Sequence, residues 1–218
     1  MEILAQRMTH NFCVGICATS NKWKTIQIEN RKDANLMMRK NNSDPGEPIG
    51  VVLRATKTIQ LPIKPQCLFE FFTNQNMKSQ WDILSYSGPM KNIIHITNGQ
   101  NLESCVSLLC ANVRMTSLLI KIACSRHLHG CNRGEDSSCV EILPNGISIV
   151  PDLSQHYSAN NYNGGNDNEF CSGSLVTIRF QILVDNLSTT DLPEKSIIDA
   201  NDIISHTIHK IKIALKCK

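Results

Sequence analysis

The sequence predicts an α+β fold in which one antiparallel sheet is covered by a long C-terminal helix, a helix-grip layout. Two observations carry this prediction. Segment 173–186, GSLVTIRFQILVDN, alternates apolar and polar residues, as a strand with two different faces does. Residues 191–215 instead place apolar side chains at helical spacing. An antiparallel sheet with one apolar face must cover that face, and the last helix is the natural cover.

Composition favours one globular domain over residues 1–218, because 41% of the residues are hydrophobic and 19% are charged. The net charge of +3 is spread along the chain, so the balance does not favour nucleic-acid binding. We find no apolar run of the roughly 18–20 residues that a membrane span needs. Glu2 and Arg7 lie where a signal peptide would be apolar. We therefore expect a chain that is not secreted, with its ten cysteines reduced and mostly buried, as Cys105 and Cys110 in apolar runs suggest.

The first 61 residues predict a helix followed by three strands. Apolar residues recur at every fourth position near the N-terminus, as on one helix face: Leu4, Met8, Phe12 and Ile16. Segments 23–28 and 35–40 are predicted as short strands. The turn cluster DPGEP then leads into a longer strand over 49–61.

Residues 66–75 predict a second helix, because Pro65 suits a first helical turn. The expected packing side of this helix is formed by Leu68, Phe69 and Phe72. The stretch that begins at Trp81 is predicted to be a short helix that runs into a β-hairpin. Trp81 would anchor the corner between helix and strand.

A hairpin is predicted between strands 90–97 and 102–110. Asn98 and Gly99 both tolerate the positive φ of a type I′ turn, so they are expected to set the register. A third strand is predicted over 117–124, and 141–150 is expected to form two short strands or one kinked strand.

Residues 152–172 are rich in Asn, Ser, Gly and Tyr and predict a mobile polar loop. After the alternating strand 173–186, Asp191 and Glu194 suggest a capping box at the start of the last helix. The apolar stripe of that helix consists of Ala200, Ile204, Ile208, Ile211 and Leu215.

Five ordered segments carry a family resemblance, and together they span nearly the whole chain: LAQRMTHNFCVGICA, DPGEPIGVVLRATKTIQLPIKP, WDILSYSGPMKNIIHITNGQNLESCVSLL, VEILPNGISIVPD and GSLVTIRFQILVDN. They resemble the C-terminal region of plant class IV homeodomain–leucine zipper (HD-ZIP IV) transcription factors. The resemblance implies a START-like fold and a nuclear location; without it we would expect a cytoplasmic one. We find neither the homeodomain, nor the zipper, nor the main START domain of that family in this sequence. The resemblance therefore carries no DNA-binding residue over to this chain.

The interval 124–139 is shorter than in the family, which would expose a strand edge or open a ligand cavity. It contains several residue types that bind zinc: Cys124, His127, His129, Cys131 and Cys139. Their spacing lacks two clean ligand pairs. We favour a divergent loop with incidental thiols and keep a zinc-stabilised loop as the alternative; no cofactor is expected.

The sequence contains no strong catalytic motif. The Gly–Ser pairs in CSGSL lack the G-x-S-x-G arrangement, and His95 has no acid that the sequence can place beside it. An enzyme of the wider helix-grip superfamily would need an acid/base pair that points into its cavity. We find no strong candidate pair, so an enzyme is not expected.

The remaining candidate site is the apolar interior, which START-type folds use for sterols or phospholipids. The candidate lining residues are Val106, Leu108, Ile178, Phe180, Ile182, Ile204, Ile208 and Ile211. A fully packed core is the competing interpretation, and we slightly favour it. The leading hypothesis is a non-enzymatic module that controls transcription through a ligand or through contacts with HD-ZIP IV proteins or other regulators. The alternative is a stand-alone lipid or sterol carrier.

Overall fold

The computed structural model describes the backbone of residues 6, 7, 9–13, 23–27, 34–42, 46–74, 76–83, 91–98, 101–110, 143–152, 154, 173–185 and 192–217. Side chains are described for the same residues except 91–98, 101–110 and 185. The predicted strand 117–124 and most of the predicted loop 152–172 lie outside these ranges. Residues 6, 7 and 9–13 are helical, which confirms the first predicted helix in its described part.

Five antiparallel strands form the main sheet in the spatial order β1-β2-β3-β7-β6. Their bounds are Lys24–Ile26 for β1, Asn35–Asn41 for β2, Gly50–Leu61 for β3, Gly146–Pro151 for β6 and Ser174–Asp185 for β7. The segment 141–150 thus supplies one strand that begins at Gly146. The two 12-residue strands β3 and β7 pair along their length at the centre of the sheet. Their alternating side chains give the sheet its two faces.

The register gives these faces different compositions. Leu53 pairs with Ile182 and Ala55 pairs with Phe180, so these four apolar residues share one face. Arg54 pairs with Gln181, and the next pair on that side joins Thr56 to Arg179. The second face therefore carries these polar side chains, with the apolar pair Val52 and Leu183 next to Arg54 and Gln181.

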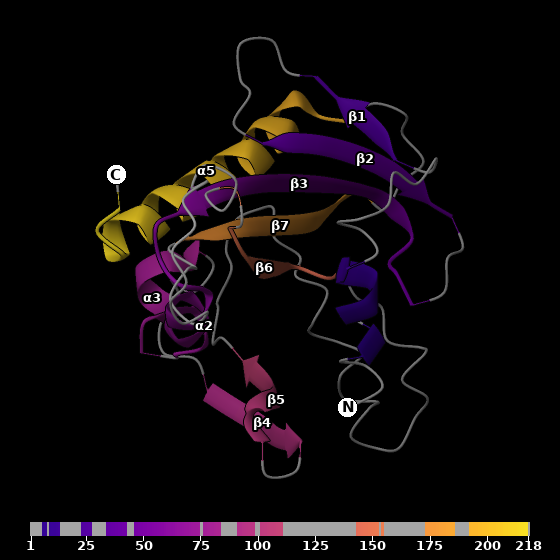
Figure 1. Ribbon diagram of the computed structural model, residues 1–218. Helices are drawn as coiled ribbons and strands as arrows, with labels where there is room; N and C mark the ends of the chain where they lie inside the picture. The colour runs from indigo at the N-terminus through magenta and orange to yellow at the C-terminus, as the bar shows by residue number, and fades with distance from the viewer. Residues whose placement is uncertain are drawn as a thin grey trace.

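Helix α5 (Glu194–Ala214) covers the apolar face, as Figure 1 shows. Ile204 and Ile211 of its predicted stripe are fully buried and Ala200 is nearly so, while Ile208 and Leu215 pack against the same core. The predicted cover is confirmed. The predicted capping box is wrong, because Pro193 occupies the N-cap and no side-chain cap bond forms. Glu194 begins the helix, where its charge suits the positive end of the helix dipole.

Helix α2 (Pro65–Thr73) begins at the proline that predicted it, and the short helix α3 (Lys78–Trp81) follows. α3 ends at Trp81, whereas the sequence predicted a helix that begins there. Leu68 is fully buried, and the rings of Phe72 and Trp81 meet edge to face with their centroids 5.1 Å apart. Trp81 thus packs where α3 ends; its predicted role at the corner between helix and strand stays a prediction, because residues 84–90 lie outside the described ranges. Phe69 is 43% exposed, because it lies about 100° around the helix from Leu68; its predicted packing role is wrong.

The hairpin β4 (Lys91–Asn98) and β5 (Asn101–Cys110) forms a sheet of its own. Asn98 pairs with Asn101, so Asn98 ends a strand and the two intervening residues are Gly99 and Gln100. The hairpin is confirmed, but its loop lies one residue later than a turn centred on Asn98 and Gly99. An irregularity in the register between Thr97 and Asn98 accompanies this shift. Gly99 itself lies outside the described residues.

The described cysteines differ from the expectation of buried thiols. Cys13 and Cys67 are exposed, and Cys217 is half-buried. Cys67 follows Gln66 on α2 and precedes the buried Leu68, so the helical turn directs it away from the core. For Cys13 and Cys67 the prediction of burial is therefore wrong. Cys105 and Cys110 lie among residues whose side chains are not described.

Candidate functional site

Six of the eight predicted cavity residues lie together at the interface between β7 and α5. Ile178 and Ile182 are buried on β7, where Phe180 lies between them on the same face. Ile204, Ile208 and Ile211 meet them from α5. The structure therefore assembles the apolar surface that the sequence predicted. Whether this surface encloses a ligand stays a prediction.

Val106 and Leu108 are placed elsewhere. Both belong to β5, which pairs with β4 in the separate two-stranded sheet. They are therefore not in the sheet that α5 covers. Their side chains lie outside the described residues. The five candidate zinc ligands between Cys124 and Cys139 also lie outside the described part of the chain. Within the ranges that the structure describes, no group of three or more His, Cys, Asp or Glu residues could hold a metal ion.

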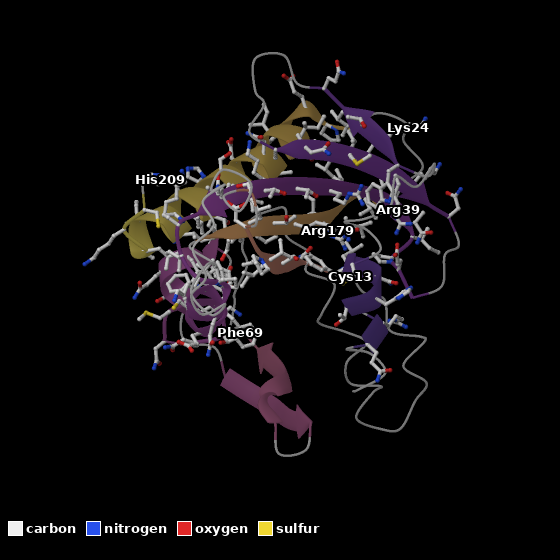
Figure 2. The ribbon with its side chains drawn as sticks, viewed as in Figure 1. Cys13, Lys24, Arg39, Phe69, Arg179 and His209 are labelled. Atoms are coloured by element: carbon white, nitrogen blue, oxygen red, sulfur yellow. The ribbon has the colours of Figure 1, made fainter. Side chains whose placement is uncertain are left out.

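The polar face of the sheet contains a second candidate site that the sequence did not predict. Arg39 on β2, Arg54 on β3 and Arg179 on β7 lie on this face at exposed fractions of 8%, 5% and 1%. We call these three residues the arginine face. Figure 2 shows Arg39 and Arg179 on the same side of the sheet as Cys13, while His209 lies away on α5. Alternation along β3 and β7 could have indicated that Arg54 and Arg179 share a face, but burial of that face could not be inferred.

The N-terminal helical segment packs against Arg179. The ring of Phe12 lies 4.5 Å from the guanidinium carbon, within cation–π range. Nη2 of Arg179 donates to the backbone carbonyl of Asn11 at 3.1 Å and lies 3.5 Å from that of Pro144. Nε and Nη1 are buried and have no hydrogen-bond acceptor among the described residues. Arg179 is therefore only partly satisfied by the part of the chain that the structure describes.

Trp23 provides an aromatic surface for the other two arginines. Its ring centre lies 4.1 Å from the guanidinium carbon of Arg54 and 5.0 Å from that of Arg39. Arg39 also forms an ion pair with Glu47 in the connection between β2 and β3. The guanidinium planes are thus held by stacking and pairing, which limits their rotation.

The electrostatics of this face follow from its burial. Burial, followed by the charge of Arg54, lowers the pKa of Arg179 to about 10, and Cys13 partly opposes this shift. Burial and the charge of Arg39 likewise lower the pKa of Arg54. Both residues remain protonated near neutral pH. The face therefore carries clustered positive charge in a region where water screens it poorly.

Comparison with known proteins identifies the family. The model of the PDF2-like C-terminal domain matches residues 1–125 and 124–217, so the chain belongs to this domain family. Its two matched segments meet at the start of the 124–139 interval. No solved structure shows significant similarity to the chain.

Named relatives come from two plants. The chain is 39% identical to the homeobox–leucine zipper proteins HDG1 and ANTHOCYANINLESS 2 of Arabidopsis thaliana, and 34% identical to ROC4 of rice, Oryza sativa subsp. japonica. The alignments cover 98–99% of this chain and 28–30% of each relative. The chain thus spans under a third of the length of these proteins, and the resemblance to the HD-ZIP IV C-terminal region is confirmed. Among the described helices, none is long and apolar enough to cross a membrane.

Proposed function

We propose that this chain is a non-enzymatic regulatory module that influences transcription through protein contacts or a bound ligand, without itself binding DNA. The observation that carries the proposal is its alignment, over almost its whole length, with under a third of each homeobox–leucine zipper relative. A START-like assignment of the helix-covered sheet, and a nuclear location, belong to the same proposal.

A tethering experiment tests this function. The 218-residue chain is fused to an unrelated DNA-binding domain, and a reporter that carries the matching DNA sites is measured in plant cells. We expect reporter output to differ from that of the DNA-binding domain alone. The variant Ile211→Ala, which weakens the α5 core, should reduce the effect, whereas Ile213→Ala at a 62% exposed position should keep it. Unaltered output with a well-expressed fusion would contradict a regulatory role.

Two further measurements separate the parts of the proposal. Co-expression of the unfused chain with a full-length relative should change the output of that relative's reporter if the chain competes for shared partners. Gel-shift titration of the purified chain against DNA fragments should show no retardation at salt concentrations near physiological. Retardation that depends on DNA sequence would assign DNA binding to this chain and overturn the proposal that it does not bind DNA itself.

A lipid or sterol carrier is the second candidate, and the apolar surface between β7 and α5 favours it. Native mass spectrometry of the reduced, purified chain tests it directly. A homogeneous adduct of lipid mass, lost when Ile208→Trp fills the interface but retained in Ile213→Trp, would support a carrier. A bare chain in every preparation would favour the packed module.

A further inference from the structure

Arg179 has donors that the described residues do not satisfy. It is 1% exposed, yet Nε and Nη1 have no acceptor in the described part of the chain. Buried charged donors without acceptors are costly, so such groups are normally paired in a stable protein. The nearest described polar partner is the backbone carbonyl of Asn11. It is neutral and accepts a hydrogen bond from Nη2 only. Arg179 therefore has both hydrogen-bonding capacity and charge for an anion.

The neighbouring arginines add to this capacity. Arg54 pairs with Gln181, and Arg179 is two residues before Gln181 on the same strand, so the two arginines are diagonal neighbours about 7–8 Å apart at the backbone. Arg39 and Arg54 have the same relationship across β2 and β3. Nη2 of Arg54 donates to Sδ of Met37 on β2 at 2.7 Å, and the charge of Arg54 is still close enough to Arg179 to lower the pKa of Arg179.

We propose that the arginine face binds a phosphate-type oxyanion, either free or as a phosphate monoester, at Arg179 with Arg54 beside it. A phosphate oxyanion provides several acceptor oxygens and a charge of about −1.5 to −2 near neutral pH, which suits adjacent guanidinium groups. Phe12 and the Asn11 carbonyl contact the Arg179 guanidinium from the side of the N-terminal helix. This site lies on the face opposite α5, so it is separate from any ligand between β7 and α5, and it does not rest on the proposed regulatory function.

Inorganic phosphate is the first probe. The purified full chain is heated in phosphate and in chloride at matched ionic strength and pH, so that general screening is equal in both buffers. Specific binding to the folded chain raises the melting temperature, by roughly 5–10 °C at about a hundredfold excess over the dissociation constant. Equal melting temperatures in the two buffers would overturn the proposal.

Matched variants assign the effect to the arginine face. Arg179→Gln should weaken phosphate binding about tenfold or more, because it removes charged hydrogen-bond donors. Lys40→Gln removes one positive charge from an exposed position on β2 and should bind phosphate within about twofold of the wild type. Equal loss in both variants would indicate a general charge effect and overturn the site. If Arg179→Gln does not fold, Arg54→Gln and calorimetric titration of the wild type against phosphate replace it, with the same criteria.

Vesicles distinguish the two sources of the oxyanion. The chain is sedimented with phosphatidylcholine vesicles that contain or lack phosphatidic acid, whose headgroup is a phosphate monoester. Binding to phosphatidic acid that Arg179→Gln abolishes would assign the site to a lipid headgroup. Stabilisation by inorganic phosphate without vesicle binding would assign it to a soluble phosphate. Vesicle binding that Arg179→Gln leaves unchanged, together with no phosphate effect in solution, would overturn the proposal.

Discussion

The ring of Phe12 lies directly over Gly146, at the point where the N-terminal helical segment meets the first residue of β6. A Cβ atom placed on Gly146 would lie 2.9 Å from Cε2 of Phe12. Side chains essentially never approach so closely, so the contact depends on the absence of a side chain at residue 146. The same ring also lies over the guanidinium of Arg179. Gly146 therefore sets how closely the N-terminal helix approaches the arginine face.

This contact predicts that Gly146→Ala destabilises the protein. The added methyl group must displace the Phe12 ring, and overpacking of this kind costs about 1–3 kcal/mol of the free energy of unfolding. Urea titration measures the loss. In a Phe12→Ala background the added methyl group has room, so the cost should shrink toward zero. A cost that is the same in both backgrounds would mean that the ring does not cause the loss.

The cover of the sheet by α5 predicts unequal effects at two isoleucines of one helix. Ile211 is fully buried, whereas Ile213 is 62% exposed. Ile211→Ala should lower the free energy of unfolding by about 2–5 kcal/mol, because it leaves a cavity beside Ile178. Ile213→Ala should change it by no more than about 0.5 kcal/mol. Similar losses in the two variants would contradict the observed orientation of α5.

The connection between β2 and β3 depends on Asn41, which is 2% exposed. Its Nδ2 donates to the backbone carbonyls of Glu47 at 3.2 Å and Pro48 at 3.0 Å. Asn41→Ala removes both donors, and we expect a loss of about 1–3 kcal/mol in thermal or urea unfolding. The adjacent Asn42 is exposed, so Asn42→Ala should be nearly neutral. Only Asn41→Ala should also weaken the ion pair between Glu47 and Arg39.

Asp152 predicts an acid-dependent loss of stability. The backbone and side chain of Ser154 lower the pKa of this carboxyl, and a hydrogen bond from Gln60 of β3 adds to the shift, although burial opposes it. The pKa is therefore lower in the folded than in the unfolded chain. The ionised Asp152 carboxylate therefore stabilises the folded chain. This stabilisation is fully present above the ordinary Asp pKa of about 3.9 and is lost as the pH falls through the lower pKa of the folded state.

Unfolding measured across this acidic range checks the prediction. Asp152→Asn should lower stability near neutral pH and flatten the pH dependence below about pH 4. Asn42→Ala, at an exposed position without a titratable group, should keep the slope of the wild type. An unchanged slope in Asp152→Asn would mean that this carboxylate does not contribute to the linkage.

Periodicity and turn chemistry determined most of the described secondary structure. The alternation of β7, the stripe of α5 and Pro65 at the start of α2 all appear where the sequence placed them. These features are local, because each depends on residues a few positions apart. The start of α5 was missed for a local reason as well: Pro193 fixes its own φ and takes the cap position from the expected aspartate.

Among the candidate sites, the sequence determined the apolar surface of β7 and α5, since both of its halves carry their own periodic signal. No local signal could show whether Val106 and Leu108 belong to that surface, because long-range pairing decides which sheet a strand joins. Only the tertiary structure placed β5 in a separate sheet. The five-block family resemblance also came from the sequence alone, and it needed no coordinates.

The arginine face was decided by the tertiary structure. Alternation puts Arg54 and Arg179 on the polar side of their strands, and on that basis alone such residues would be expected to lie in water. They are buried because Phe12, Trp23 and the segment around Pro144 pack over that side, across separations of up to 168 residues. A local pattern specifies which residues share a face. What covers the face depends on contacts between distant segments, and burial then determines both the pKa of Arg179 and its capacity to hold an anion.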